Sequence, residues 1–200
     1  MHAGYSHLLN YVGRPEEAME QIKMALKLDP MNPFIITFYA VDLVFIRKYD
    51  EAIRAFQEAM QIAPGYPFAL GNLWQVYYLK GDSVRAWDTF QSILKALEPE
   101  LLESCERAYV ENGLEGALLA NAAGLELRSD EQYLNPTEIA NIYALTGKND
   151  KAIYWLERAW EARDPNLPYL LLPVYDPLRD DPRFQDICHR MNLPYRPPSV

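Results

Sequence analysis

The sequence predicts an all-α protein built from stacked antiparallel helix hairpins. Three observations lead to this fold class. Self-comparison of the 200-residue chain reveals residues that recur at a fixed interval, which is typical of helical repeats. The strong helix formers Ala, Leu, Glu and Lys dominate the recurring segments. Glycine or proline stands between most of these segments, where a helix has to end.

The interval is clearest at small residues. Ala18, Ala52 and Ala86 are each 34 residues apart, and we expect them where the two helices of a hairpin approach closely. Glycine at the turn would end the first helix in a left-handed cap, and proline would end the second helix. The same interval separates the turn residues Gly13, Arg47 and Gly81, the bulky residues Ile22, Phe56 and Phe90, and the prolines Pro30 and Pro64.

A repeated helix–turn–helix unit of this length resembles the tetratricopeptide repeat (TPR) family. The resemblance implies a right-handed superhelical solenoid. Hairpins are expected at about 1–30, 33–64 and 67–98, with a degenerate unit at 99–128 around Gly113 and a fifth unit at 133–162.

The repeat pattern stops after Ala162, which divides the chain into a repeat array (1–162) and an irregular C-terminal cap (163–200). Residues 163–177 are apolar and broken by prolines, so we expect them to lie extended across the last repeats. Asp181 and Pro182 predict the start of a short helix that ends at Met191. The final residues, LPYRPPSV, are expected to be disordered or loosely attached.

The C-terminal region also resembles the ends of bacterial multidomain regulators. In those proteins a TPR array follows a winged-helix DNA-binding domain, a serine/threonine kinase or a nucleotide cyclase. The resemblance implies a regulatory or protein-interaction tail, although no such output domain is present in these 200 residues. The matching residues are Trp155, Leu156, Glu157, Arg158, Ala159, Asp176, Pro177, Leu178, Arg179, Asp181, Pro182, Arg183 and Phe184.

Composition excludes several classes of partner. The net charge is −9 and no Lys/Arg cluster opposes it, so direct nucleic-acid binding is not expected. Cys105 and Cys188 are far apart, as in a cytoplasmic protein with reduced thiols. Neither a signal peptide nor an uncharged run of membrane-spanning length is found, so we expect no membrane contact and a cytoplasmic location.

No enzymatic motif is present. The sequence lacks G-x-x-x-x-G-K-[ST], G-x-S-x-G, H-E-x-x-H and C-x-x-C, so no catalytic residue and no cofactor are predicted. Cys188 and His189 are adjacent, and adjacent side chains on a helix diverge by about 100°. We therefore expect no metal site there and interpret Cys188 as a buried residue of the last helix.

The candidate binding surface is the concave groove that the first helices of the hairpins would line. Tetratricopeptide domains that bind chaperone tails use Lys, Asn and Arg in this groove, but only Asn72 matches, so we reject a carboxylate clamp. An apolar helix or extended peptide fits better, and the chain's own LPYLLLPVY segment is an equal alternative. The predicted groove residues are Asn10, Phe34, Phe38, Val41, Phe45, Phe68, Asn72, Gln75, Tyr78 and Asn141, with His7, Tyr11, Thr37 and Thr137 beside them.

A second candidate surface is an N-terminal docking face formed by Tyr5, Leu8 and Tyr11, which would dock an upstream domain or form a homodimer. The function hypotheses are a non-enzymatic protein-interaction scaffold and, as the alternative, the sensory or regulatory C-terminal module of a larger bacterial transcription regulator, kinase or cyclase. A stand-alone enzyme is a third, less favoured hypothesis, because no convergent set of ionisable groups is evident.

Overall fold

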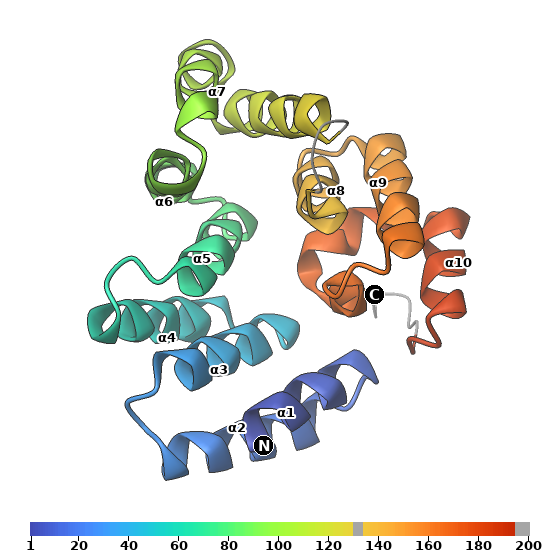
Figure 1. Cartoon of the computed structure of the whole chain (residues 1–200). Coiled ribbons are helices and arrows are strands. Elements are labelled where there is room, and N and C mark those ends of the chain that lie inside the picture. The colour runs from blue at the N-terminus through green and yellow to red at the C-terminus, as the bar shows by residue number, and fades with distance from the viewer. Residues whose placement is uncertain (130–133, 195–200) are drawn as a thin grey trace. The chain divides into compact units, whose positions relative to one another are not determined.

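The computed structural model describes residues 1–129 and 134–194, and it confirms the all-helical fold class (Figure 1). These residues contain helices and no strands. The helices are α1 (His2–Tyr11), α2 (Pro15–Leu28), α3 (Pro33–Phe45), α4 (Tyr49–Ile62), α5 (Pro67–Leu79), α6 (Ser83–Leu97), α7 (Pro99–Arg128), α8 (Pro136–Leu145), α9 (Asn149–Ala162), the 3-10 helices η1 (Leu167–Leu171) and η2 (Pro173–Leu178), and α10 (Pro182–Arg190).

The chain forms two compact units, Met1–Ile93 and Leu94–Val200, which we call unit 1 and unit 2. The boundary falls inside α6. The division expected from the sequence, between residues 162 and 163, lies instead within unit 2.

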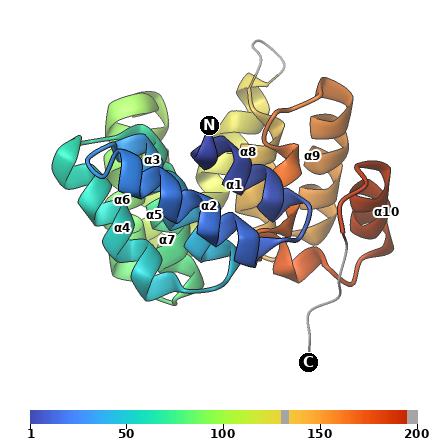
Figure 2. The same cartoon turned by 90° about the horizontal axis from the view of Figure 1, so that it is seen from below.

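Unit 1 is made of helices that pack on their neighbours in the chain (Figure 2). α1 packs on α2 and α3 on α4, and α2 and α4 in turn contact α3 and α5. The rings of Trp74 on α5 and Phe90 on α6 are 5.1 Å apart. Ala18, Ala52 and Ala86 are fully buried, as expected for positions where two helices approach closely.

The turns of unit 1 share one geometry. Gly13, Arg47 and Gly81 all have positive φ, of 71°, 60° and 75°. After each of them, the next N–H donates to a carbonyl five residues earlier, for example from Arg14 to Leu9 at 2.8 Å. This bonding satisfies carbonyls at the end of the preceding helix and reverses the chain. Arg47 adopts the conformation that glycine adopts at the other two turns, at a steric cost.

In unit 2, α7 is interrupted at Gly113, where φ is 65° and ψ is −158°. The sequence places two helices around this glycine, and the structure has the break there. The two halves pack closely, because a Cβ added at Gly124 would lie 2.5 Å from Leu101 Cδ2. Any larger residue at position 124 would therefore force the Leu101 side chain to move. α8 and α9 then form a further hairpin, whose turn residue Gly147 has a φ of 69°.

The expectation of an extended segment at 163–177 is wrong. This stretch forms η1 and η2. Proline is the second residue of η1 and the first residue of η2. Proline suits this position because its missing N–H would have no partner in the first turn of a helix. Apolar side chains from both short helices are buried, and η2 packs on α8 and α9.

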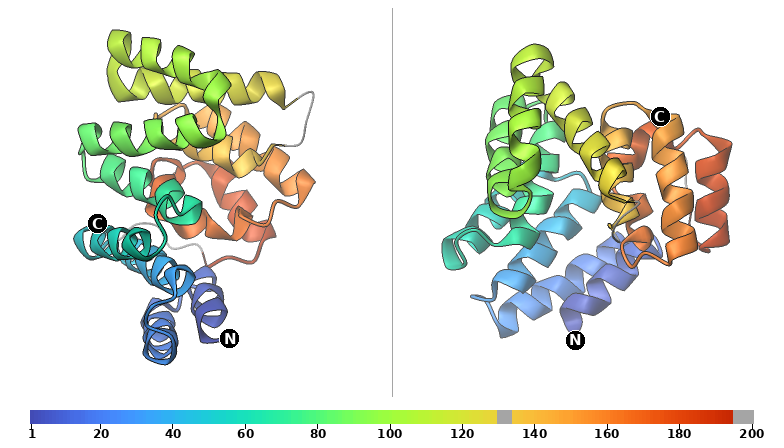
Figure 3. Two further views of the ribbon diagram at one scale, coloured as in Figure 1. Left: turned by 60° about the vertical axis from the view of Figure 1, so that its left-hand side comes forward. Right: turned by 45° about the horizontal axis from the view of Figure 1, so that its top comes forward.

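The last helix is where the sequence predicts it. α10 begins at Pro182, and the Asp181 carboxylate accepts from the backbone N–H of Arg183 at 2.9 Å. α10 packs on α9 (Figure 3). Of the tail expected to be disordered, residues 195–200 lie outside the described residues.

Within residues 1–129 and 134–194, no helix combines the length and apolar character that a membrane-spanning helix requires.

Candidate functional site

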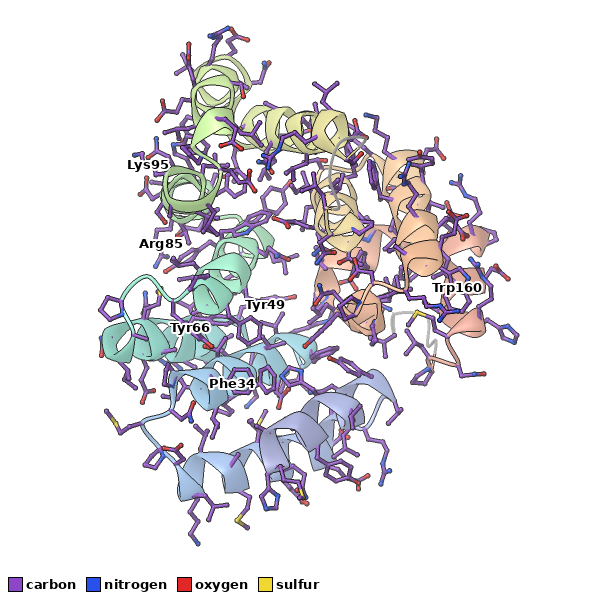
Figure 4. All side chains as sticks on the ribbon, viewed as in Figure 1. Phe34, Tyr49, Tyr66, Arg85, Lys95 and Trp160 are labelled. Carbon is purple, nitrogen blue, oxygen red and sulfur yellow. The ribbon has the colours of Figure 1, made fainter. Side chains whose placement is uncertain are left out.

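Four aromatic residues of unit 1 form a continuous contact surface, which we call the aromatic row: Phe34 and Phe38 on α3, Phe68 on α5, and Tyr66 just before α5. The ring centroids of Phe34 and Phe38 are 4.3 Å apart, and those of Phe38 and Phe68 are 5.5 Å apart. Tyr66 extends the row, with its ring 6.4 Å from that of Phe68. Figure 4 labels Phe34 and Tyr66 at the starts of α3 and α5.

The repeat spacing explains why these rings meet. Pro33 and Pro67 are the first residues of α3 and α5, and each is followed by phenylalanine. Phe34 and Phe68 thus hold equivalent positions in two successive hairpins, 34 residues apart, and their centroids are separated by 6.2 Å. Phe38 joins them because it lies one helical turn after Phe34.

Part of this surface is accessible. Phe34 is 46% exposed, although it is a large apolar residue. Phe38, Phe68 and Tyr66 are half-buried. An accessible group of clustered aromatic rings, held by helices, is a surface that a partner could cover.

Other predicted groove residues differ from expectation. Asn10, Thr37 and Val41 are buried, so they offer no accessible binding surface. The side-chain amides of Asn72 and Gln75 donate to carbonyls of their own helix, those of Phe68 and Gly71. The remaining predicted residues, Phe45, Asn72, Gln75 and Tyr78 in unit 1 and Asn141 in unit 2, are half-buried.

A buried polar cluster lies directly behind the aromatic row. It consists of His7 and Asn10 on α1 and Asp42 on α3. Asn10 Nδ2 donates to Asp42 Oδ1 at 2.7 Å, and His7 Nε2 lies 3.9 Å from the same oxygen. The His7 ring also packs edge-on against Phe38, with centroids 3.7 Å apart.

The sequence predicts a surface or groove role for His7, and this is wrong. His7 is only 3% exposed and Asp42 only 1%. The repeat pattern does not single out Asp42. A lone carboxylate inside the apolar run FIITFYAVDLVF is nevertheless a signal, visible in the sequence, of a buried ionisable group.

Burial sets the ionisation of this cluster. It raises the pKa of Asp42 to about 7, against the opposing effect of hydrogen bonds from Ser6 and Asn10. It also lowers the pKa of His7 to about 4. In mildly acidic solution Asp42 therefore holds a proton and His7 is neutral, so no net charge is buried between α1 and α3.

The predicted N-terminal docking face is only partly exposed. Tyr5 and Leu8 are exposed, but Tyr11 is half-buried, with its ring 6.2 Å from that of His7. Met1 and Val12, which were not among the predicted residues, are exposed on α1 or at its ends.

The C-terminal segment covers α8 inside unit 2. The backbone N–H of Thr137, in the first turn of α8, donates to the buried carboxylate of Asp164 at 3.1 Å. Thr137 is buried at this contact. The LPYLLLPVY segment, which forms η1 and the first half of η2, begins three residues after Asp164 in the chain. It packs on α8 and α9 of its own unit.

Neither cysteine is paired in a disulfide, and both lie in the interior. Cys105 and Cys188 are free and buried, and burial raises the pKa of each thiol to about 11. Among residues 1–129 and 134–194, no group of three or more His, Cys, Asp or Glu is placed to hold a metal ion.

Comparison with protein-family models and with curated protein sequences finds no match to this chain.

Proposed function

We propose that the chain is a non-enzymatic protein-interaction scaffold and that its hairpins belong to a TPR-like, right-handed superhelical solenoid. Two features of the repeats support the solenoid. Small residues are buried at intervals of 34. Each of the successive turns has one residue in the left-handed conformation, followed by a backbone hydrogen bond to the carbonyl five residues earlier. Repeats built alike stack on one another with a constant rotation, which generates a superhelix.

The aromatic row is the proposed binding surface, and its exposure is the observation that carries the proposal. The partner is an apolar helix or an extended peptide that places side chains against Phe34 and Phe68. Because both phenylalanines stand on well-packed helices, little conformational entropy of the scaffold is lost on binding. Aromatic anchors of this kind commonly contribute most of the binding energy of an interface.

The remaining features of the molecule agree with this function. The two groups with the most strongly shifted pKa values in unit 1, His7 and Asp42, are buried behind the row and not presented to a substrate. The net charge of −9 opposes nucleic acid as the partner. Two buried, free cysteines fit a reducing cytoplasm. No cofactor enters the proposal.

The test selects binding peptides from a phage-displayed random library and measures their affinity by fluorescence anisotropy. Replacing Phe34 and Phe68 together by Ala should weaken binding at least about tenfold, because two aromatic anchors are lost. The matched control is Tyr154→Ala, which removes an exposed aromatic ring of α9. Equal affinity of the double variant and the control, with helical circular dichroism retained, would discard the aromatic row as the binding surface.

A second proposal is that the chain is the regulatory C-terminal module of a larger bacterial transcription regulator, kinase or cyclase. The specific support is the C-terminal block from Asp176 to Phe184, which resembles those proteins. The intact mass of the endogenous protein separates the two proposals. A species near 23.1 kDa supports the free-standing scaffold, and a much larger species supports the regulatory module.

A further inference from the structure

Phe38 connects the aromatic row with the interior of unit 1. Its ring contacts two other members of the row, with centroids 4.3 Å from that of Phe34 and 5.5 Å from that of Phe68. It also packs against a buried apolar cluster that α1 and α2 form. The row therefore takes its support from α1 and α2, although its own rings belong to α3 and α5 or stand just before α5.

The ring of His7 on α1 lies closer to Phe38 than either neighbour in the row. The two centroids are 3.7 Å apart, and the ring planes meet at 63°, an edge-to-face contact. Such a contact prefers one relative orientation, because the positive edge of one ring faces the negative face of the other. An aliphatic side chain in the place of His7 would not impose this orientation on Phe38.

The position of His7 is in turn set by a polar contact between α1 and α3. Asn10, one helical turn after His7, donates from Nδ2 to Asp42 Oδ1 at 2.7 Å. His7 Nε2 lies 3.9 Å from the same oxygen, and all three side chains are buried. A buried hydrogen bond requires a definite direction, so it selects one rotation of α1 against α3. That rotation brings the His7 ring behind Phe38.

Stability alone does not favour this arrangement. Burying a carboxyl group costs free energy even when it is hydrogen-bonded, and a well-packed apolar pair is often at least as stable. The remainder of α3 is almost entirely apolar, so a leucine or valine at position 42 would match its surroundings. A polar group buried between helices can instead fix their register, which is the service that Asp42 performs for α1.

We propose that His7 is a positioning residue of the aromatic row: held by the Asn10–Asp42 contact, its ring keeps Phe38 in the orientation that binds the partner. This inference rests on the proposed function, because the partner of the row is part of it. His7 is buried and acts only through Phe38. Without the His7 ring, Phe38 turns more freely, and a partner has to immobilise it at a cost in conformational entropy.

Fluorine NMR of the full chain tests the orientation of Phe38 without any partner. The seven phenylalanines are replaced by fluorinated phenylalanine, and the Phe38 signal is assigned from its loss in Phe38→Leu. His7→Leu fills the site without a ring and should broaden or shift this signal. The signal of Phe184, fully buried in unit 2, is the internal reference and should stay the same.

Two further variants control this measurement. His7→Phe restores a ring and should restore a narrow Phe38 signal. His2→Ala removes a histidine of the same helix whose Nδ1 lies 2.8 Å from Gln21 Oε1 on α2, so it should leave the signal as in the wild type. If His7→Leu does not fold, His7→Gln provides the same test, because glutamine also lacks a ring.

The second measurement is affinity for a peptide selected from the phage-displayed library, by fluorescence anisotropy at a temperature where circular dichroism shows every variant folded. His7→Leu should weaken binding about two- to tenfold, the cost of immobilising one loosened side chain. His7→Phe and His2→Ala should bind as the wild type does. A role in stability alone would lower the melting temperature and leave the affinity unchanged.

An unchanged Phe38 signal in His7→Leu would overturn the positioning role. Unchanged affinity of this variant would do the same, provided that the Phe34 and Phe68 double variant still loses binding, and the aromatic row would remain the binding surface. His7→Phe binding as weakly as His7→Leu would show that the ring is not what acts. If the double variant binds as tightly as the wild type, the proposed function itself has failed, and the inference fails with it.

Discussion

The buried His7–Asp42 pair makes a prediction about how stability varies with pH. In the unfolded chain, Asp42 has a pKa of 3.8 and His7 a pKa of 6.5, so between these values only the histidine is protonated. In the folded protein, with pKa values of about 7 and about 4, only the aspartate is protonated. Both states bind one proton, so from about pH 4 to 6.5 the pair adds no pH dependence to the free energy of unfolding.

Removing either partner should expose a large slope, and the two slopes should have opposite signs. In Asp42→Asn, His7 keeps its lowered pKa, so the unfolded state binds more protons and stability rises with pH. In His7→Gln, Asp42 keeps its raised pKa, so its stabilising contribution is complete below about pH 4 and is lost as pH rises to 7. Each slope approaches about 1.4 kcal/mol per pH unit, or roughly 3 kcal/mol across the window.

The measurement is urea-induced unfolding, followed by circular dichroism at intervals between about pH 4 and 7. Subtracting the wild-type profile from each variant removes the contributions of all other ionisable groups. Val84→Ala is the control, because it changes an exposed apolar residue of unit 1 and removes no ionisable group, so it should leave the profile as it is in the wild type. The free energy of unfolding of each variant, minus that of the wild type, is compared across this pH range. If both differences are independent of pH, or change with pH in the same direction, then the proton bound by His7 in the unfolded chain is not replaced by one on Asp42 in the folded protein.

Two further predictions concern the repeats of unit 1. Replacing the fully buried Ala52 by Leu should overpack the hairpin and destabilise the protein by about 1–3 kcal/mol, measured by thermal unfolding; an unchanged melting temperature would contradict the assigned register. Arg47→Gly should instead stabilise it by up to about 1 kcal/mol, because a φ of 60° is strained for arginine and not for glycine. Chemical unfolding measures this second change, and a lower unfolding midpoint for the variant would show that the arginine side chain matters more than its backbone strain.

The helices could be predicted from the sequence because their ends are marked locally. Gly13 and Gly81 adopt the left-handed conformation that glycine favours, and Pro182 begins the last helix as expected. The segment after Ala162 could not be assigned in the same way. Its prolines exclude a long α-helix but are compatible with both extended backbone and short 3-10 turns, and packing against α8 and α9 decides between them.

The candidate site was only partly predictable for a related reason. Phe34 and Phe68 could be paired from their spacing, since equivalent positions of successive repeats become neighbours. Which side of α1 becomes buried depends on the exact rotation of that helix against α3, which the repeat interval does not determine. This is why the sequence predicts an accessible surface for His7 and Asn10, while they lie buried against Asp42.

The cover that η1 and η2 place on the α8–α9 hairpin also has a consequence for synthesis on the ribosome. α8 and α9 leave the ribosome before the apolar residues that bury their surface, among them Leu170, Val174 and Leu178. Until residue 178 has followed, the nascent α8–α9 hairpin presents uncovered hydrophobic area, the kind of surface that chaperones recognise. Unit 1 meets no such delay, because its helices contact neighbours that are close in the chain. Translation pauses placed between codons 162 and 178 should therefore be the most damaging to the yield of folded protein.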